Sequence, residues 1–148
     1  MTTQTKELGA GAAVGPTGAG ATVTRVLTTV VARGLFAVPF AVFGALHFVG
    51  ANAMAAMVPV PGVVFWVYFT GLALIAGAAG IVTGRLGKWA AFGLAALMLV
   101  FVLTVHLPGL GNPQTGQLSM ISLLKDLALA GGALTWAGIF DRAREGRR

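Results

Sequence analysis

Residues 62–82, GVVFWVYFTGLALIAGAAGIV, form an uninterrupted run without a charged side chain. A helix that crosses the hydrocarbon core of a bilayer needs about 20 consecutive apolar residues. The run is continuously apolar and does not alternate between apolar and polar residues, which excludes a strand of a membrane barrel. Because backbone groups in lipid must be hydrogen-bonded within the protein, we predict a transmembrane helix here.

Three further apolar runs of similar length flank this one, at residues 26–49, 86–107 and 118–140. The whole chain is 57% hydrophobic and 9% charged, whereas soluble domains are about 45–50% apolar and about 25% charged. This composition excludes an ordinary water-soluble globule. We therefore predict an all-α integral membrane four-helix bundle over residues 25–141, with the lipid bilayer as its surroundings.

The two ends of the chain differ from this central part. Residues 1–24 are rich in Gly, Ala and Thr and show no helical period, which predicts a disordered tail. Residues 142–148 are mainly arginine and predict a basic cytoplasmic tail.

The basic residues predict the orientation of the helices. Residues 50–61 and 108–117, which form two of the three connections, carry no charge. The other connection and the ends of the chain carry the basic anchors, which are Arg25, Arg33, Arg85, Lys88 and Arg142. Since cytoplasmic loops are enriched in Lys and Arg, both termini are expected in the cytoplasm. The net charge of +6 thus reflects membrane topology, and no nucleic-acid partner is expected.

Aromatic and small residues add to this picture. Trp66, Trp89 and Trp136 fall near predicted helix ends, as in an interfacial belt. Small residues recur four positions apart, which lets helices approach closely, at Gly80–Gly84, Ala128–Gly132 and Ala133–Ala137.

Four ionisable side chains are expected to meet in the outer half of the bundle. His47 ends the first helix, His106 ends the third, and Lys125 and Asp126 lie near the start of the fourth. Asp126 is roughly 12 Å along its helix, counted from residue 118. It shares a face with small and mildly polar residues, including Ser122, so it should point inward and pair with His47 or His106. Lys125 does not face Asp126 on a helix and is expected to extend toward the interface.

Ionisable residues at membrane depth are by default a functional hypothesis, but three interpretations stay open. The cluster could hold the helices in register, form a ligand or redox pocket, or ligate a metal or haem. The chain has no cysteine, and two histidines with one aspartate are a thin ligand set for zinc. No metal is therefore predicted, and nothing specific supports a haem between His47 and His106.

Several stretches resemble the DoxX-like family of small four-helix membrane proteins. They are Phe43-Gly44-Ala45-Leu46-His47-Phe48, Met57-Val58-Pro59, Tyr68-Phe69-Thr70-Gly71, Val105-His106-Leu107-Pro108 and the Lys125-Asp126-Leu127-Ala128-Leu129-Ala130-Gly131-Gly132 stretch. The resemblance covers most of residues 30–140. The motif positions it carries over are His47, Pro59, His106, Lys125 and Asp126.

The resemblance implies a membrane subunit of a quinone- or thiol-linked redox system in the bacterial plasma (inner) membrane, with a soluble redox enzyme as partner. Any thiol chemistry would belong to the partner or substrate, because this chain lacks cysteine. Two alternatives remain: a non-catalytic anchor or scaffold for soluble enzymes, and a carrier of a small hydrophobic molecule. Four helices without an inverted repeat are few for a transporter, although a homo-oligomer would reduce that objection.

Overall fold

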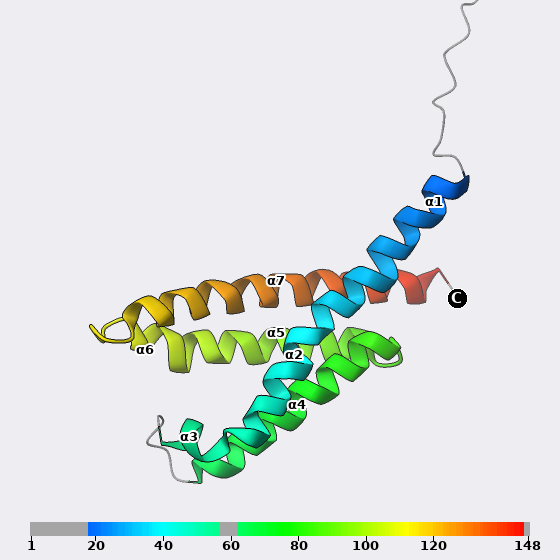
Figure 1. Cartoon of the computed structure of the whole chain (residues 1–148). Helices are drawn as coiled ribbons and strands as arrows, with labels where there is room; N and C mark the ends of the chain where they lie inside the picture. Colours follow the sequence, from blue (N-terminus) through cyan, green and yellow to red (C-terminus); the bar gives the residue numbers. More distant parts are fainter. Residues whose placement is uncertain (1–17, 57–61, 147–148) are drawn as a thin grey trace, which may run out of the picture.

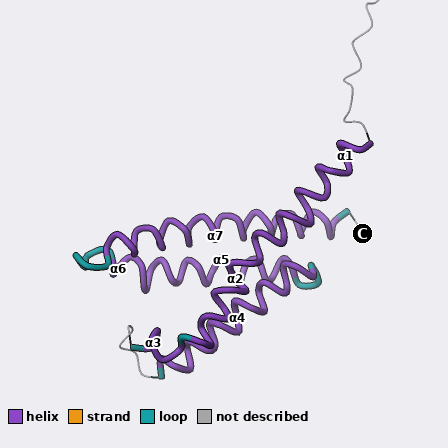
Figure 2. The backbone as a smooth tube through the Cα atoms, in the orientation of Figure 1, coloured by secondary structure: helices purple, strands orange, loops and turns teal. Residues whose placement is uncertain are grey.

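The computed structural model describes residues 18–56 and 62–146, and over that part of the chain it contains helices and turns but no strand (Figure 2). Its four helices long and apolar enough to cross a membrane are Gly18–Val49, Val63–Thr83, Gly87–Gly109 and Gly116–Glu145. The predicted all-α class and the four membrane-length helices are therefore confirmed.

The first helical rod starts earlier than the apolar pattern predicts. It consists of α1 (Gly18–Arg25), the π-helical segment η1 (Val26–Val31) and α2 (Ala32–Val49). Part of the segment expected to be a disordered tail is thus helical, while residues 1–17 lie outside the described residues. Extending an existing helix costs much less than nucleating a new one, so the apolar rod can carry the helix into a polar stretch.

The remaining elements follow in order. They are α3 (Ala51–Ala55), α4 (Val63–Thr83), α5 (Gly87–Phe101), the π-helical segment η2 (Val102–His106), α6 (Leu107–Gly109) and α7 (Gly116–Glu145). The last helix extends past the predicted end at residue 140, so the start of the basic tail is helical as well.

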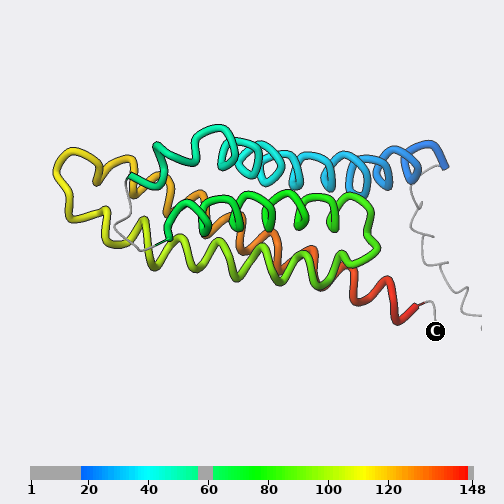
Figure 3. Tube along the Cα trace, turned by 90° about the horizontal axis from the view of Figure 1, so that it is seen from below, coloured from blue at the N-terminus to red at the C-terminus, as the bar shows by residue number. Residues whose placement is uncertain are grey.

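The rods form two antiparallel pairs that pack on each other (Figures 1 and 3). One pair is α2 with α4, the other is α5 with α7, and contacts between α4 and α5 join the pairs. The start of α1, the α4–α5 turn and the end of α7 lie at one end of the molecule, which we name the terminal end. The short helices α3 and α6 lie at the other end, which we name the loop end.

The core is narrow and the apolar outer surface is wide. Phe40, Leu74 and Leu94 are almost completely buried between the rods. By contrast, Leu35 is 70% exposed and Val49 is 86% exposed. Large exposed apolar surfaces are rare on soluble monomers, so this surface fits a lipid surrounding.

Small residues bring the rods together, as expected, but not at every predicted position. A Cβ atom added to Gly44 would lie 2.8 Å from the Gly71 carbonyl oxygen, which shows that the α2 and α4 backbones touch. Gly80 packs equally closely against the side chain of Ala90. Gly84, however, ends α4 in a left-handed conformation with φ of 68°, which glycine adopts without strain.

In α7, too, only some of the residues predicted to pack between helices are buried. Ala133 and Ala137 are buried in the core, and Gly132 packs against the ring of Phe36. Ala128 is exposed, so its expected role as a packing residue is not seen.

Candidate functional site

The Asp126 carboxylate is the buried charged group around which the candidate site is built. Asp126 is 2% exposed and lies toward the loop end of α7. Its Oδ2 atom lies 2.9 Å from Nε2 of His106, and its Oδ1 atom lies 3.1 Å from Nζ of Lys125. Each carboxylate oxygen therefore has its own partner, which is what a charge at this depth requires.

The helical face predicted for Asp126 is confirmed by its burial. Ala130, Ala133 and Ala137 follow it along the same face and are all buried. Of the two histidines expected as partners, His106 makes the contact. Ser122 is half-buried one turn before Asp126, and no hydrogen bond of its hydroxyl group is seen within the described residues.

Lys125 behaves differently from the prediction, because it does contact its neighbour Asp126. The lysine stem is long enough to fold back along the helix, although adjacent residues point in different directions on it. The ammonium also lies 4.3 Å from the centroid of the Phe43 ring on α2, within the range of a cation–π contact. The Lys125 side chain is 41% exposed. It therefore contacts the buried Asp126 carboxylate and the Phe43 ring while remaining partly at the surface.

The π-helical segment η2 determines where His106 points. In an α-helix, residues five apart are separated by roughly 140° around the axis, so Phe101 and His106 would diverge. The i to i+5 bonding of a π-helix brings such residues closer to one face. Phe101 stacks on the His47 ring, with centroids 6.3 Å apart and planes at 12°, while His106 reaches Asp126. The sequence carries no reliable signal for this segment.

His47 lies next to the cluster but is not bonded to its carboxylate. Its Nδ1 atom is 2.7 Å from the Phe43 carbonyl oxygen. Since a carbonyl only accepts, Nδ1 carries the proton and donates. His47 and Lys125 thus both contact Phe43. His47 donates to the Phe43 backbone carbonyl, and the Lys125 ammonium lies over the Phe43 ring. Pro59, the remaining position suggested by the resemblance, lies outside the described residues.

The predicted topology anchors gather at the terminal end but do not act alike. Lys88 forms an ion pair with Asp141, with Nζ 2.7 Å from Oδ1. The Arg33 guanidinium packs over the rings of Trp136 and Phe140, at 5.7 and 5.2 Å from their centroids. Trp136 is correspondingly buried in the core, whereas Trp66 and Trp89 are exposed as an interfacial belt requires. The interfacial role predicted for Trp136 is therefore wrong.

The arrangement at the loop end can hold and exchange a proton. A carboxylate hydrogen-bonded to one imidazole nitrogen fixes the orientation and the tautomer of the ring. No hydrogen bond of the other nitrogen, Nδ1 of His106, is seen within residues 18–56 and 62–146, and the ring is 18% exposed. In the same part of the chain, no three His, Cys, Asp or Glu side chains are grouped closely enough to hold a metal ion.

Comparison with family models, curated proteins and solved structures finds no match for this chain. The resemblance to the DoxX-like family accordingly stays a prediction that rests on the quoted stretches of sequence.

Proposed function

We propose that this protein is a DoxX-like membrane subunit of a redox system, and that His106 exchanges protons with a quinone. The observation that carries the proposal is the triad of His106, Lys125 and Asp126, whose Asp126 carboxylate is buried inside an otherwise apolar bundle. Burying a carboxylate in lipid is expensive, so such groups are usually retained for ligand or proton handling.

The chemistry follows from the hydrogen bonds. With Nε2 donating to Asp126, the remaining nitrogen of His106 donates to a quinone carbonyl when the ring carries a second proton. Conversion of a quinone to a quinol takes up two electrons and two protons. In this proposal a soluble redox enzyme supplies the electrons, and His106, oriented by Asp126, passes protons taken from water to the quinone oxygens. The Lys125 ammonium lies 3.1 Å from the other carboxylate oxygen and supplies the opposite charge.

The orientation belongs to the same proposal. With the basic terminal end in the cytoplasm, the triad lies in the outer half of a bacterial plasma membrane. His47 then lies on the α2 side of the cluster, where its half-buried ring offers a second polar contact to the same ligand.

Quinone binding by the purified protein tests the proposal directly. Decylubiquinone is titrated into detergent-solubilised protein, and binding is followed by quenching of tryptophan fluorescence. His106→Gln and Asp126→Asn should each weaken binding by tenfold or more, on the order of one hydrogen bond to a charged group. Lys88→Gln, which breaks an ion pair at the other end of the molecule, is the matched control and should bind normally. Unchanged affinity in folded His106→Gln protein would contradict the proposal.

A scaffold is the second candidate function. It is favoured by the fact that both carboxylate oxygens already have partners, so the triad can simply hold η2 against α7 and α7 against α2. A scaffold predicts that the wild-type protein binds no decylubiquinone but retains a soluble enzyme during purification from the native membrane.

A further inference from the structure

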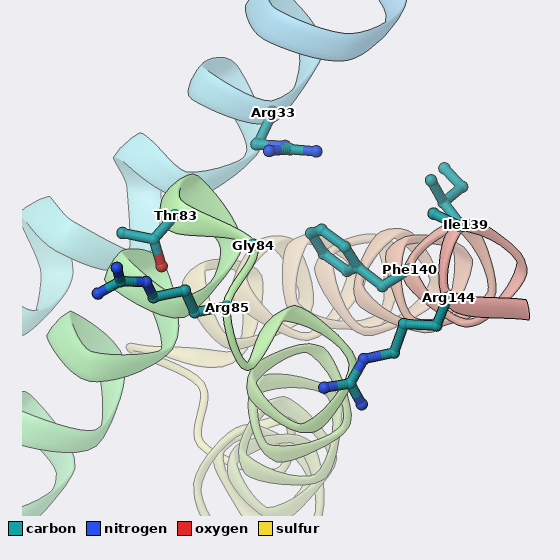
Figure 4. A pocket seen from close by; sticks show the side chains of 8 residues that line it. Arg33, Thr83, Gly84, Arg85, Ile139, Phe140 and Arg144 are labelled. Atoms are coloured by element: carbon teal, nitrogen blue, oxygen red, sulfur yellow. The ribbon is translucent and has the colours of Figure 1, made fainter. Parts of the chain in front are cut away.

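The second polar region of the molecule is a cavity at the terminal end, far along the rods from the triad. It has a volume of about 780 Å³ and is lined by residues from α2, the α4–α5 turn and α7 (Figure 4). Three of its eight lining residues are arginines, Arg33, Arg85 and Arg144, and none is acidic. A concave surface with charges of one sign concentrates ions of the opposite sign.

Arg33 is the fixed charge of this cavity. Its guanidinium is held over two rings, and Nη1 lies 3.5 Å from the Val82 carbonyl oxygen, at the limit of a hydrogen bond. Its Nε atom is buried and has no hydrogen-bond partner within the described residues. The carboxylate of Asp141, the residue that follows Phe140, is paired with Lys88. Arg33 lines the cavity and brings to it a positive charge that no ion pair within the described residues balances, and an anion would balance it.

The other two arginines are exposed and able to turn toward the same anion. Figure 4 shows the guanidinium groups of Arg85 and Arg144 extending in different directions from the cavity wall. Neither forms an ion pair within the part of the chain that the structure describes. Their rotation toward a ligand thus breaks no salt bridge.

An apolar groove continues from this cavity along the lipid-facing side of α4 and α5. Its volume is about 750 Å³, and it shares Thr83 and Arg85 with the polar cavity. It extends as far as Phe69, and the 1.5 Å rise per residue makes that roughly 21 Å from Thr83. One leaflet contributes about half of the roughly 30 Å hydrocarbon core, so the groove is long enough for an acyl chain.

We infer that the terminal end binds an anionic phospholipid. The phosphate is held by Arg33, Arg85 and Arg144, and one acyl chain lies in the groove between α4 and α5. Continuity of the two cavities favours a lipid over free phosphate, because a free anion would make no use of the apolar half. Basic pockets between membrane helices at the cytoplasmic surface are suited to anionic headgroups.

Trp89 provides the readout, since it lines the groove and is exposed to lipid. The protein, with Trp66 replaced by Phe and buried Trp136 retained, is reconstituted in phosphatidylcholine vesicles. Increasing fractions of brominated phosphatidylglycerol or brominated phosphatidylcholine are then included as quenchers. The proposal predicts preferential quenching by phosphatidylglycerol, with the preference falling roughly fivefold for each arginine removed.

Matched variants separate this site from general attraction to positive charge. Arg33→Gln and Arg85→Gln should each reduce the preference by about fivefold, while Arg142→Gln, which removes the same charge outside the cavity, should keep it. Arg85 is exposed, so its variant reports on binding even where Arg33→Gln fails to fold. Equal losses in all three variants, or no preference in the wild-type protein, would overturn the proposal. So would displacement of phosphatidylglycerol by inorganic phosphate, which would identify a free anion as the ligand.

Discussion

At the scale of single residues, Asp126 makes two polar contacts at the loop end of the molecule through its carboxylate. It is bonded to His106 across two rods and to Lys125 on its own helix. Interhelical hydrogen bonds in membranes contribute modestly, because the unfolded state in lipid also finds partners. The contact to His106 should therefore be measurable without being the main source of stability.

A double-mutant cycle on His106→Ala and Asp126→Ala tests this contact. The coupling free energy should be about 0.6 kcal/mol and no more than about 1.7 kcal/mol, measured by denaturant-induced unfolding in mixed micelles. His47→Ala with Asp126→Ala is the matched control and should show almost no coupling, because His47 stacks on Phe101 and does not bond to the carboxylate. Equal coupling of both histidines to Asp126 would show that the contact is assigned to the wrong ring.

At the scale of elements, the close crossing of α2 and α4 determines how the first two rods pair. Gly44 and Gly71 face each other there, and a Cβ atom on Gly71 would lie 3.0 Å from the Gly44 carbonyl oxygen. The obstacle is backbone, which cannot rotate away as a side-chain end can. Dispersion at such close approaches replaces the hydrophobic drive that lipid removes.

Substitution of Gly44 by Ala should therefore separate these helices. The added methyl group would meet the Gly71 carbonyl and Ile75, and overpacking of this kind costs about 1–3 kcal/mol. Gly34→Ala on the same helix meets nothing within 4 Å and should be neutral or slightly stabilising, since alanine favours helix more than glycine. Thermal unfolding in detergent checks both, and similar melting temperatures for the two variants would disprove the close crossing.

At the scale of the whole molecule, four membrane-length rods place the start of α1 and the end of α7 at the same end. The turn between α6 and α7 lies at the opposite end. The distribution of basic residues then predicts which end is cytoplasmic. The proposed quinone and lipid sites consequently lie toward opposite faces of the membrane.

Single-cysteine labelling tests this orientation cleanly, because the native chain contains no cysteine. In intact cells, a membrane-impermeant maleimide should label Asn112→Cys, in the α6–α7 turn, and should leave Gly146→Cys unlabelled until the cells are opened. The reverse pattern would place the triad in the cytoplasmic half of the bilayer.

Local sequence properties were sufficient for the helical rods and for the burial of Asp126. Continuous apolar runs in lipid leave the backbone little alternative to helix, and the Asp126 face is visible from the spacing of its small neighbours. Helix ends were less predictable: the rod before residue 26 is helical although its composition is that of a tail, because helix extends readily from an existing rod.

Tertiary structure alone decided which groups meet. Nothing in the sequence distinguishes His47 from His106 as the partner of Asp126, since the choice depends on the π-helical turn of η2. Likewise, the sequence predicts only a topology anchor at Arg33, whereas the crossing of the rods places its guanidinium over the rings of Trp136 and Phe140. Composition and periodicity determine each helix separately, whereas contacts between helices depend on their rotation and crossing, which only the packed molecule specifies.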